Sequence, residues 1–245
     1  MKNLRLELSF DGTDYHGWQV QKNTDMTVQN VLYTALGRIC RPRGYPTGCG
    51  RTDAGVHAKR YTASVFAECS VPAEKLPAAL NANLPPDIRC FGAAEVPEDF
   101  NALFSAKRKV YTYYINCAPV YDPLRLRYCH SVRGRLDLEA MRAAAAHFCG
   151  VHDFYGFSSS GRSTKTTVRR MYSAGVEEKE GLIALRLEAE GFLYNMARII
   201  AGTLIFCGLG RIAPGDIPGI ILSRDRRLAG PTAPAKGLFL TEVIY

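Results

Sequence analysis

The sequence of 245 residues predicts an α+β fold, in which largely antiparallel mixed sheets are flanked by helices. Three patterns indicate this class. Residues 4–10 alternate polar and apolar side chains, which is typical of a strand with one buried face. Residues 28–39 repeat their apolar side chains at helical spacing. Residues 166–176 and 182–190 read as two consecutive strands, and such hairpins produce antiparallel pairing.

The first half of the chain alternates strands and helices. Asp11-Gly12 is expected to form a turn after the first strand, and Thr27 is the expected N-cap of the helix 28–39. Residues 41–50 are rich in proline and glycine, which predicts a loop. The remaining elements expected here are a strand at 61–67, a short helix at 74–81, an extended segment at 88–96 and an aromatic strand at 110–116.

A basic, proline-containing connector at 118–135 predicts the division into domains 1–118 and 119–245. The second half repeats the strand-helix-strand order of the first without clear sequence identity. Its hairpin is expected to turn at Glu180-Gly181. Its other expected elements are helices at 137–148, 193–206 and 214–222 and a closing strand at 238–244.

Charge and composition narrow the function classes. Hydrophobic residues make up 47% of the chain and charged residues 22%, which excludes disorder, collagen and coiled coil as overall descriptions. The net charge is +8 and most basic residues are arginine, which suits phosphate and base contacts. Nucleic acid is therefore the favoured partner, ahead of an anionic membrane surface or plain solvated faces. The basic clusters lie at 38–43, 59–60, 107–109, 125–135, 162–170 and 224–227.

The eight cysteines include no C-x-x-C pair, so we expect reduced thiols and no zinc site. The longest apolar stretch, residues 199–209, contains glycines and is too short to cross a membrane. The first ten residues alternate charged and apolar side chains, unlike a signal or transit peptide. We therefore expect a cytoplasmic protein that binds no membrane.

The loop at residues 48–58 carries an arginine and an acid two positions apart. If the segment is extended, Arg51 and Asp53 point the same way and can face one cleft. Spacing alone favours a simpler interpretation, in which Asp53 is a turn residue and His57 a hydrogen-bonded structural histidine.

A family resemblance favours the functional interpretation. Residues 50–58 read G-R-T-D-A-G-V-H-A and resemble the active-site loop of the tRNA pseudouridine synthase A family. The other blocks that are similar to this family appear in order along nearly the whole chain, at 10–19, 100–113, 152–154 with 167–169, 192–198 and 237–240. Residues 155–165 depart from the pattern, so no roles are assigned there.

The resemblance implies a pseudouridine synthase fold with two similar halves and an active-site cleft between them. It implies that uridines at positions 38–40, in the anticodon stem-loop of tRNA, are isomerised to pseudouridine. The base is cut at its nitrogen, turned, and rejoined through carbon 5, so no cofactor and no metal are expected. A homodimer is implied as well.

The resemblance also assigns four site residues. Asp53 is the catalytic carboxylate, which either attacks the sugar carbon or removes a sugar proton, and Arg198 pairs with it. Arg51 flips or holds the base, and Tyr111 stacks on uracil. Judged without the resemblance, Arg51 is a phosphate contact, Tyr111 a buried strand residue and Arg198 an arginine that reaches solvent. Asp11 and Asp153 are expected to be turn or cap residues.

Two rival classes of function remain open: a non-catalytic RNA-binding module, and a nuclease or base-excising glycosylase. A non-catalytic RNA-binding module would use the aromatic strand 110–114 as a base-stacking surface and would not need Asp53. A metal-dependent nuclease needs clustered carboxylates, and only isolated ones are evident. A base-excising glycosylase would release free uracil, whereas a synthase leaves the mass of the RNA unchanged.

Overall fold

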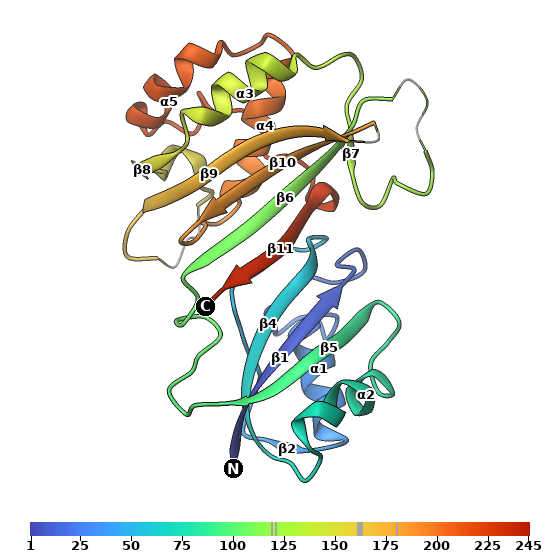
Figure 1. The fold of residues 1–245 in the computed structure, drawn as a ribbon. Coiled ribbons are helices and arrows are strands. Elements are labelled where there is room, and N and C mark those ends of the chain that lie inside the picture. The colour runs from blue at the N-terminus through green and yellow to red at the C-terminus, as the bar shows by residue number, and fades with distance from the viewer. Residues whose placement is uncertain (119, 121, 161–163, 180) are drawn as a thin grey trace. The chain divides into compact units, whose positions relative to one another are not determined.

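A computed structural model describes residues 1–118, 120, 122–160, 164–179 and 181–245. The chain divides into two compact units (Figure 1). The first unit contains residues 1–107 and 239–245, and the second contains residues 108–238. This division differs from the expected boundary at 118/119, because the aromatic strand pairs within the second unit and the closing strand pairs within the first.

The sheet of the first unit has β1 (Lys2–Phe10) at its centre, antiparallel to both β4 (His57–Glu68) and β5 (Ile88–Val96). β11 (Leu238–Ile244) joins the other edge of β4 in parallel, with Phe239 opposite His57. Two short strands, β2 (Arg41–Pro42) and β3 (Thr47–Gly48), also pair with β4. Residues 41–68 therefore fold back on themselves as an irregular hairpin.

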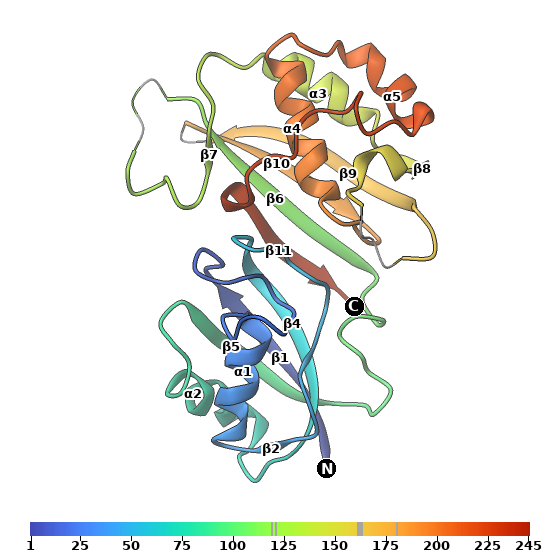
Figure 2. The same cartoon turned by 180° about the vertical axis from the view of Figure 1, so that it is seen from behind.

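Two helices cover one face of this sheet, α1 (Val28–Gly37) and α2 (Leu76–Asn81), with a 3-10 turn at Ala73–Lys75 before α2 (Figure 2). The Thr27 side chain accepts a hydrogen bond from the Asn30 amide, so the expected N-cap is confirmed. The alternating side chains of β1 supply the core from the sheet side, and Leu4, Leu6 and Leu8 are all buried.

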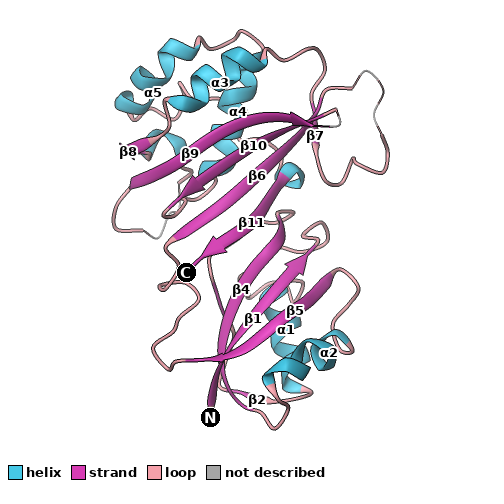
Figure 3. Ribbon diagram, viewed as in Figure 1, coloured by secondary structure: helices cyan, strands magenta, loops and turns pink. Residues whose placement is uncertain are grey.

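The sheet of the second unit runs in the order β6-β10-β9-β8, with antiparallel neighbours throughout, and β7 adds to β6 in parallel (Figure 3). These strands are β6 (Arg108–Asn116), β7 (His130–Ser131), β8 (Gly150–Asp153), β9 (Val168–Lys179) and β10 (Leu182–Ala189). The expected turn between β9 and β10 includes Glu180, which lies outside the described residues.

One face of this second sheet is covered by α3 (Leu138–Ala146) and α4 (Met196–Gly208) (Figures 1 and 2). α5 (Ile217–Ser223) follows a 3-10 turn at Pro214–Asp216, and further 3-10 turns lie at Tyr155–Phe157 and Ala235–Gly237. Asp137 caps α3 by accepting from the Ala140 amide. α4 is apolar nearly all round and eleven of its residues are buried, so it is the central helix of the unit.

The predicted α+β class, with mostly antiparallel strands and flanking helices, is confirmed. The element boundaries differ where strands are very short: β2 and β3 lie inside the expected loop at 41–50, and β7 and β8 were not expected at all. α4 begins at Met196 rather than at 193, because Asn195 has a left-handed backbone that interrupts the helical conformation.

The expectation that all cysteines are reduced thiols is wrong for one pair. Cys40 and Cys69 form a disulfide, with their Cα atoms 4.6 Å apart. The cause is the antiparallel pairing of β2 with β4. Arg41 lies opposite Glu68, so the adjacent residues Cys40 and Cys69 face each other. Spacing along the sequence does not reveal this contact, because 29 positions separate the two cysteines.

Candidate active site

The loop that carries Asp53 lies between β3 and β4 and is held against residues 11–18. The Trp18 amide donates to the Thr52 carbonyl at 3.1 Å, and the Gly55 amide donates to the Tyr15 carbonyl at 3.3 Å. Within the loop, the Val56 amide donates to the Asp53 carbonyl at 3.1 Å and closes a tight turn. The backbone on both sides of Asp53 is therefore fixed by main-chain hydrogen bonds.

Two glycines allow this close approach of the two segments. Gly17 has φ +86°, and a Cβ atom there would lie 2.4 Å from the Thr52 carbonyl oxygen. A Cβ atom at Gly12 would lie 2.0 Å from the Val56 carbonyl oxygen. Any side chain at either position would push the loop away from its support.

His57 closes the loop where β4 begins. Its Nδ1 lies 3.0 Å from the Gly12 amide, which can donate to it, and 3.0 Å from Oδ1 of Asp11, which accepts when the ring is protonated there. The ring is 1% exposed and stacks on Phe239 of β11 at 4.5 Å. His57 is thus a buried, hydrogen-bonded structural residue, as the simpler interpretation of the motif expected.

Aromatic side chains pack beneath the loop. Trp18 is buried and stacks on Tyr61 of β4 with ring centroids 4.3 Å apart. The Tyr61 hydroxyl donates to the Gly50 carbonyl, which is the residue before Arg51. Gly48 passes so close to both rings that a Cβ atom would collide with them. This packing anchors the first half of the loop to the core.

The side chains that the loop presents differ in exposure. Asp53 is partly buried and Arg51 is exposed, so part of each side chain is accessible to a substrate. Asp11 is placed differently, because its carboxylate accepts from the Thr13 amide and hydroxyl and contacts His57. Asp11 is therefore a turn residue, as expected.

The second unit contributes Tyr111 and Arg198. Tyr111, on β6, is 8% exposed, and its ring meets Phe192 edge to face with centroids 4.9 Å apart. Tyr111 is thus mostly packed, as its simpler interpretation expected, and its contact with uracil stays a prediction.

Arg198 lies in the first turn of α4 and is partly buried. Its Nε donates to the Ala233 carbonyl and its Nη1 donates to Oδ1 of Asn195, both at 2.8 Å. The Arg198 carbonyl in turn accepts from the Ala233 amide at 3.1 Å. The guanidinium is therefore oriented by the protein and does not simply extend into solvent.

Residues 230–234 run along α4 as a tight strap and carry the Ala233 acceptor. Gly202 allows this, because a Cβ atom there would lie 1.8 Å from the Pro231 carbonyl oxygen. The Tyr113 hydroxyl donates to the Pro234 carbonyl at 2.9 Å. Burial raises the pKa of Tyr113 above its usual range, with Arg198 opposing that shift, so the hydroxyl stays protonated and keeps donating.

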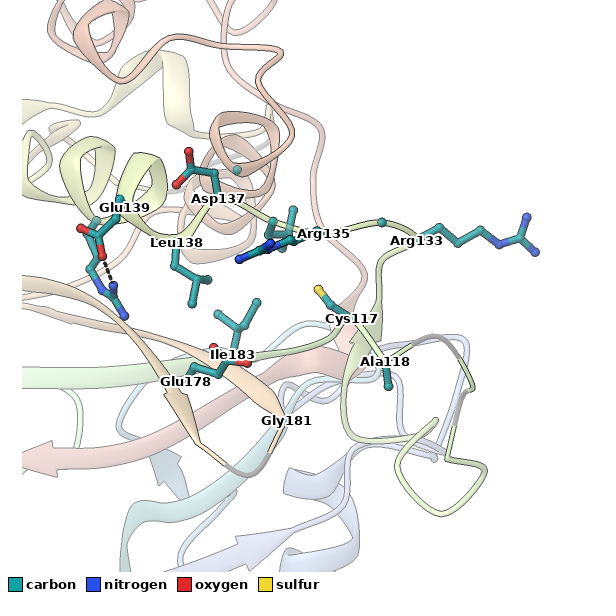
Figure 4. A pocket seen from close by; sticks show the side chains of 14 residues that line it. Cys117, Ala118, Arg133, Arg135, Asp137, Leu138, Glu139, Glu178, Gly181 and Ile183 are labelled. Atoms are coloured by element: carbon teal, nitrogen blue, oxygen red, sulfur yellow. Dashed lines mark hydrogen bonds and ion pairs between the residues drawn. The ribbon is translucent and has the colours of Figure 1, made fainter.

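The second unit also has an open groove of about 1300 Å³ at the N-terminus of α3 (Figure 4). Leu138 and Ile183 face each other across it, and Arg133 points away from it. None of the four predicted site residues lines this groove, and its rim mixes arginines with carboxylates. It is a separate feature from the candidate active site.

Two further observations bear on the expected partners. Among the described residues, no cluster of three or more histidine, cysteine, aspartate or glutamate side chains could hold a metal ion. No helix in the described part of the chain is both long enough and apolar enough to cross a membrane.

Comparison with known proteins decides the family. A family model described as tRNA pseudouridine synthase matches residues 8–105 and 144–245, which include Arg51, Asp53 and Arg198. The chain belongs to the tRNA pseudouridine synthase family. Members of this family are isomerases that act on uridine in tRNA. This chain is therefore an isomerase of tRNA uridines.

Curated relatives of this synthase match it over their full length. It is 45% identical to a tRNA pseudouridine synthase A of Ruminiclostridium cellulolyticum and 44% identical to one of Thermoanaerobacter sp., with all of each chain covered. It is 40% identical to a tRNA pseudouridine synthase A of Clostridium acetobutylicum, again with both chains fully covered. The resemblance stated from the motifs is confirmed.

The structure thus places Arg51 and Asp53 on one loop of the first unit and Tyr111 and Arg198 on two elements of the second. Sequence reasoning assigned no role to Gly17, Phe192 or Asn195, although all three lie inside the motif blocks. Each acts through contacts with distant residues. The sequence offered no signal for Asn195, because it lies inside the helix expected at 193–206, whereas α4 begins after it.

Proposed function

We propose that this synthase isomerises uridines at positions 38–40 in the anticodon stem-loop of tRNA, with Asp53 as the catalytic carboxylate. The observation that carries this proposal is the rigid loop around Asp53, bonded on both sides to residues 15–18. A carboxylate that must meet one sugar needs a fixed backbone, because small misplacements cost large factors in rate.

In the proposed reaction, the bond between N1 of uracil and the sugar carbon C1′ breaks, and a bond from C5 to C1′ forms. C5 loses a proton and N1 gains one, so atoms and electrons balance without a cofactor. Asp53 either attacks C1′, forming an ester that the turned base displaces, or removes a sugar proton. Both routes require an ionised carboxylate.

The other site residues support this carboxylate and the base. Arg198 pairs with Asp53 and orients it, because a guanidinium forms charge-assisted hydrogen bonds with a carboxylate. Tyr111 stacks on the uracil ring. Arg51, exposed beside Asp53, flips the base or holds it in the site.

The substrate must expose its uridine before chemistry, and extruding a base costs a few kcal/mol. The net charge of +8 favours contacts with phosphates, and the binding free energy of these contacts offsets the cost of extrusion. We place the enzyme in the cytoplasm with its tRNA substrate and propose that it works as a homodimer, which light scattering of the purified protein would test.

The first experiment is incubation with unmodified tRNA transcripts, followed by mapping of pseudouridine by carbodiimide-stop sequencing. Wild-type protein is expected to modify uridines in the anticodon stem-loop. Asp53→Asn is expected to lose turnover while keeping tRNA affinity, because the amide can neither attack the sugar nor take a proton. Asp99→Asn makes the same charge change at an exposed position and serves as the matched control.

Three outcomes would contradict the proposal. Substantial turnover in clean Asp53→Asn protein would remove Asp53 from the chemistry. Release of free uracil would indicate a glycosylase. Tight tRNA binding by wild-type protein without any pseudouridine would favour the non-catalytic binding module.

A further inference from the structure

Asn195 has an unusual backbone at the start of α4. Its φ and ψ are 61° and 4°, in the left-handed region that residues other than glycine rarely adopt. Among the described residues, only Asn195 and Arg224 are non-glycine residues with positive φ. Such a conformation persists only where surrounding contacts hold it, and it is frequent at functional sites.

The side chain of Asn195 is not used as a helix cap. An asparagine in the N-cap position usually accepts from the second or third amide of its helix, and Asn195 makes no such bond. Its Oδ1 instead accepts from Nη1 of Arg198 at 2.8 Å, and its Nδ2 donates to Oγ of Ser159 at 2.9 Å. The carboxamide thus links the arginine to the segment after the 3-10 turn at 155–157.

The backbone of Ser159 is also hydrogen-bonded to the segment just before α4. Its amide donates to the Tyr194 carbonyl at 3.1 Å, so the serine and the start of α4 are joined by two hydrogen bonds. With Oγ of Ser159 accepting from Nδ2, the carboxamide cannot rotate without losing one bond, and its oxygen stays aimed at Arg198. This gives a role to a segment where the family pattern assigned none.

Ala233 and Asn195 contact the Arg198 guanidinium through neutral oxygens. Nε donates to the Ala233 carbonyl and Nη1 to the Asn195 carboxamide, so the group is oriented while its positive charge is not neutralised by either. A carboxylate at position 195 would fix the same geometry but would also cancel the charge. These two contacts therefore orient the guanidinium without opposing its charge.

We infer that Asn195 is a positioning residue, which orients Arg198 for its carboxylate partner and is itself oriented by Ser159. This inference rests on the proposed pairing of Arg198 with Asp53. Asn195 touches neither substrate nor reacting atoms in this role, and its effect on catalysis passes entirely through Arg198.

Single-turnover kinetics on unmodified tRNA tests this role. Asn195→Gly suits the left-handed backbone and removes only the carboxamide, so the fold is expected to persist. Its rate should fall about ten- to a hundredfold, as for other small misplacements, with tRNA affinity unchanged. Asn195→Asp keeps the acceptor but competes for the charge of Arg198, and should lose at least as much. Ser159→Ala should show a smaller loss that Ser159→Thr restores.

The deciding comparison uses Arg198→Met. If Asn195 acts through the arginine, adding Asn195→Gly to Arg198→Met should change the rate no further. Independent multiplication of the two losses would overturn the inference, as would a normal rate in Asn195→Gly. If Arg198→Met itself keeps the wild-type rate, the proposed role of Arg198 fails, and the inference fails with it. In that case, turnover that is present in the wild type and lost in Asp53→Asn would show that the proposed overall function still holds.

Discussion

Gly17 illustrates how much of the active site depends on residues that carry no functional group. It touches the loop of Asp53 only through backbone atoms, and its left-handed conformation and its missing side chain are both required. Glycines such as Gly17 therefore help to determine the position of the Asp53 carboxylate.

Replacing Gly17 with alanine should therefore damage both stability and rate. The left-handed conformation costs about 1–2 kcal/mol for alanine, and the contact of 2.4 Å with the Thr52 oxygen adds about 1–3 kcal/mol of overpacking. Gly210→Ala is the matched control, because Gly210 has φ +69° and a Cβ atom there meets nothing within 4 Å. Urea unfolding and turnover on tRNA would measure both effects. Equal losses in the two variants would contradict the role given to the contact.

Arg198 and Asp53 should behave as one unit in catalysis. Arg198→Met is expected to reduce turnover, because the carboxylate loses the charge-assisted contact that orients it. The loss in the double variant Arg198→Met/Asp53→Asn should be far less than the product of the single losses. A double-mutant cycle on kcat measures this directly. Fully independent effects would mean that Arg198 serves another purpose, such as tRNA contact.

At the residue scale, the sequence identified side chains whose chemistry is visible in a motif, and the comparisons confirmed the family. It did not assign roles to Asn195 or Gly17, because their functions consist of contacts with Ser159 and Thr52, which are far away in the sequence. The roles of Asp53, Arg51, Tyr111 and Arg198 themselves stay predictions until variants are measured.

At the scale of elements, the hairpin from β2 to β4 holds the loop that carries Asp53. The disulfide between Cys40 and Cys69 closes one end of this hairpin, and the loop of Asp53 occupies the other. The cross-link therefore encloses the whole segment that carries Arg51 and Asp53.

Reduction of this disulfide should lower stability measurably. Closing a loop across 29 positions restricts the unfolded chain and stabilises the fold by about 3–4 kcal/mol in the chain-entropy description. Urea unfolding with and without dithiothreitol should show this difference for the wild type. The variant Cys40→Ser/Cys69→Ser should be less stable and insensitive to dithiothreitol. An identical response of both proteins to the reductant would sink the prediction.

Elements with strong periodicity were predictable from sequence, including β1, α1 and β10. Short strands such as β2, β3 and β8 were not, because two to four residues contain no readable alternation and their pairing depends on partners elsewhere. The disulfide was missed for the same reason. The start of α4 was misjudged because the apolar pattern continues through Leu193, before the left-handed residue that interrupts it.

At the scale of the whole molecule, the excess of positive charge should govern tRNA affinity. The logarithm of the binding constant should fall linearly with the logarithm of salt concentration, by about 0.7–0.9 per phosphate contacted. Filter binding of unmodified tRNA from low to moderate salt measures this slope. Unfolding measurements over the same range would exclude a general loss of structure, and a nearly flat slope would contradict phosphate-dominated binding.

The path of the chain through the first unit has a consequence for its synthesis. Phe239, which stacks on His57, belongs to a strand that leaves the ribosome only after all of residues 108–238. At about 5–20 residues per second, that interval lasts on the order of 10 s. During it, β4 lacks its β11 neighbour and His57 lacks its aromatic cover, so a nascent chain cannot yet hold the loop of Asp53 in its final environment. The loop of Asp53 therefore reaches its final packing only after both units have been translated.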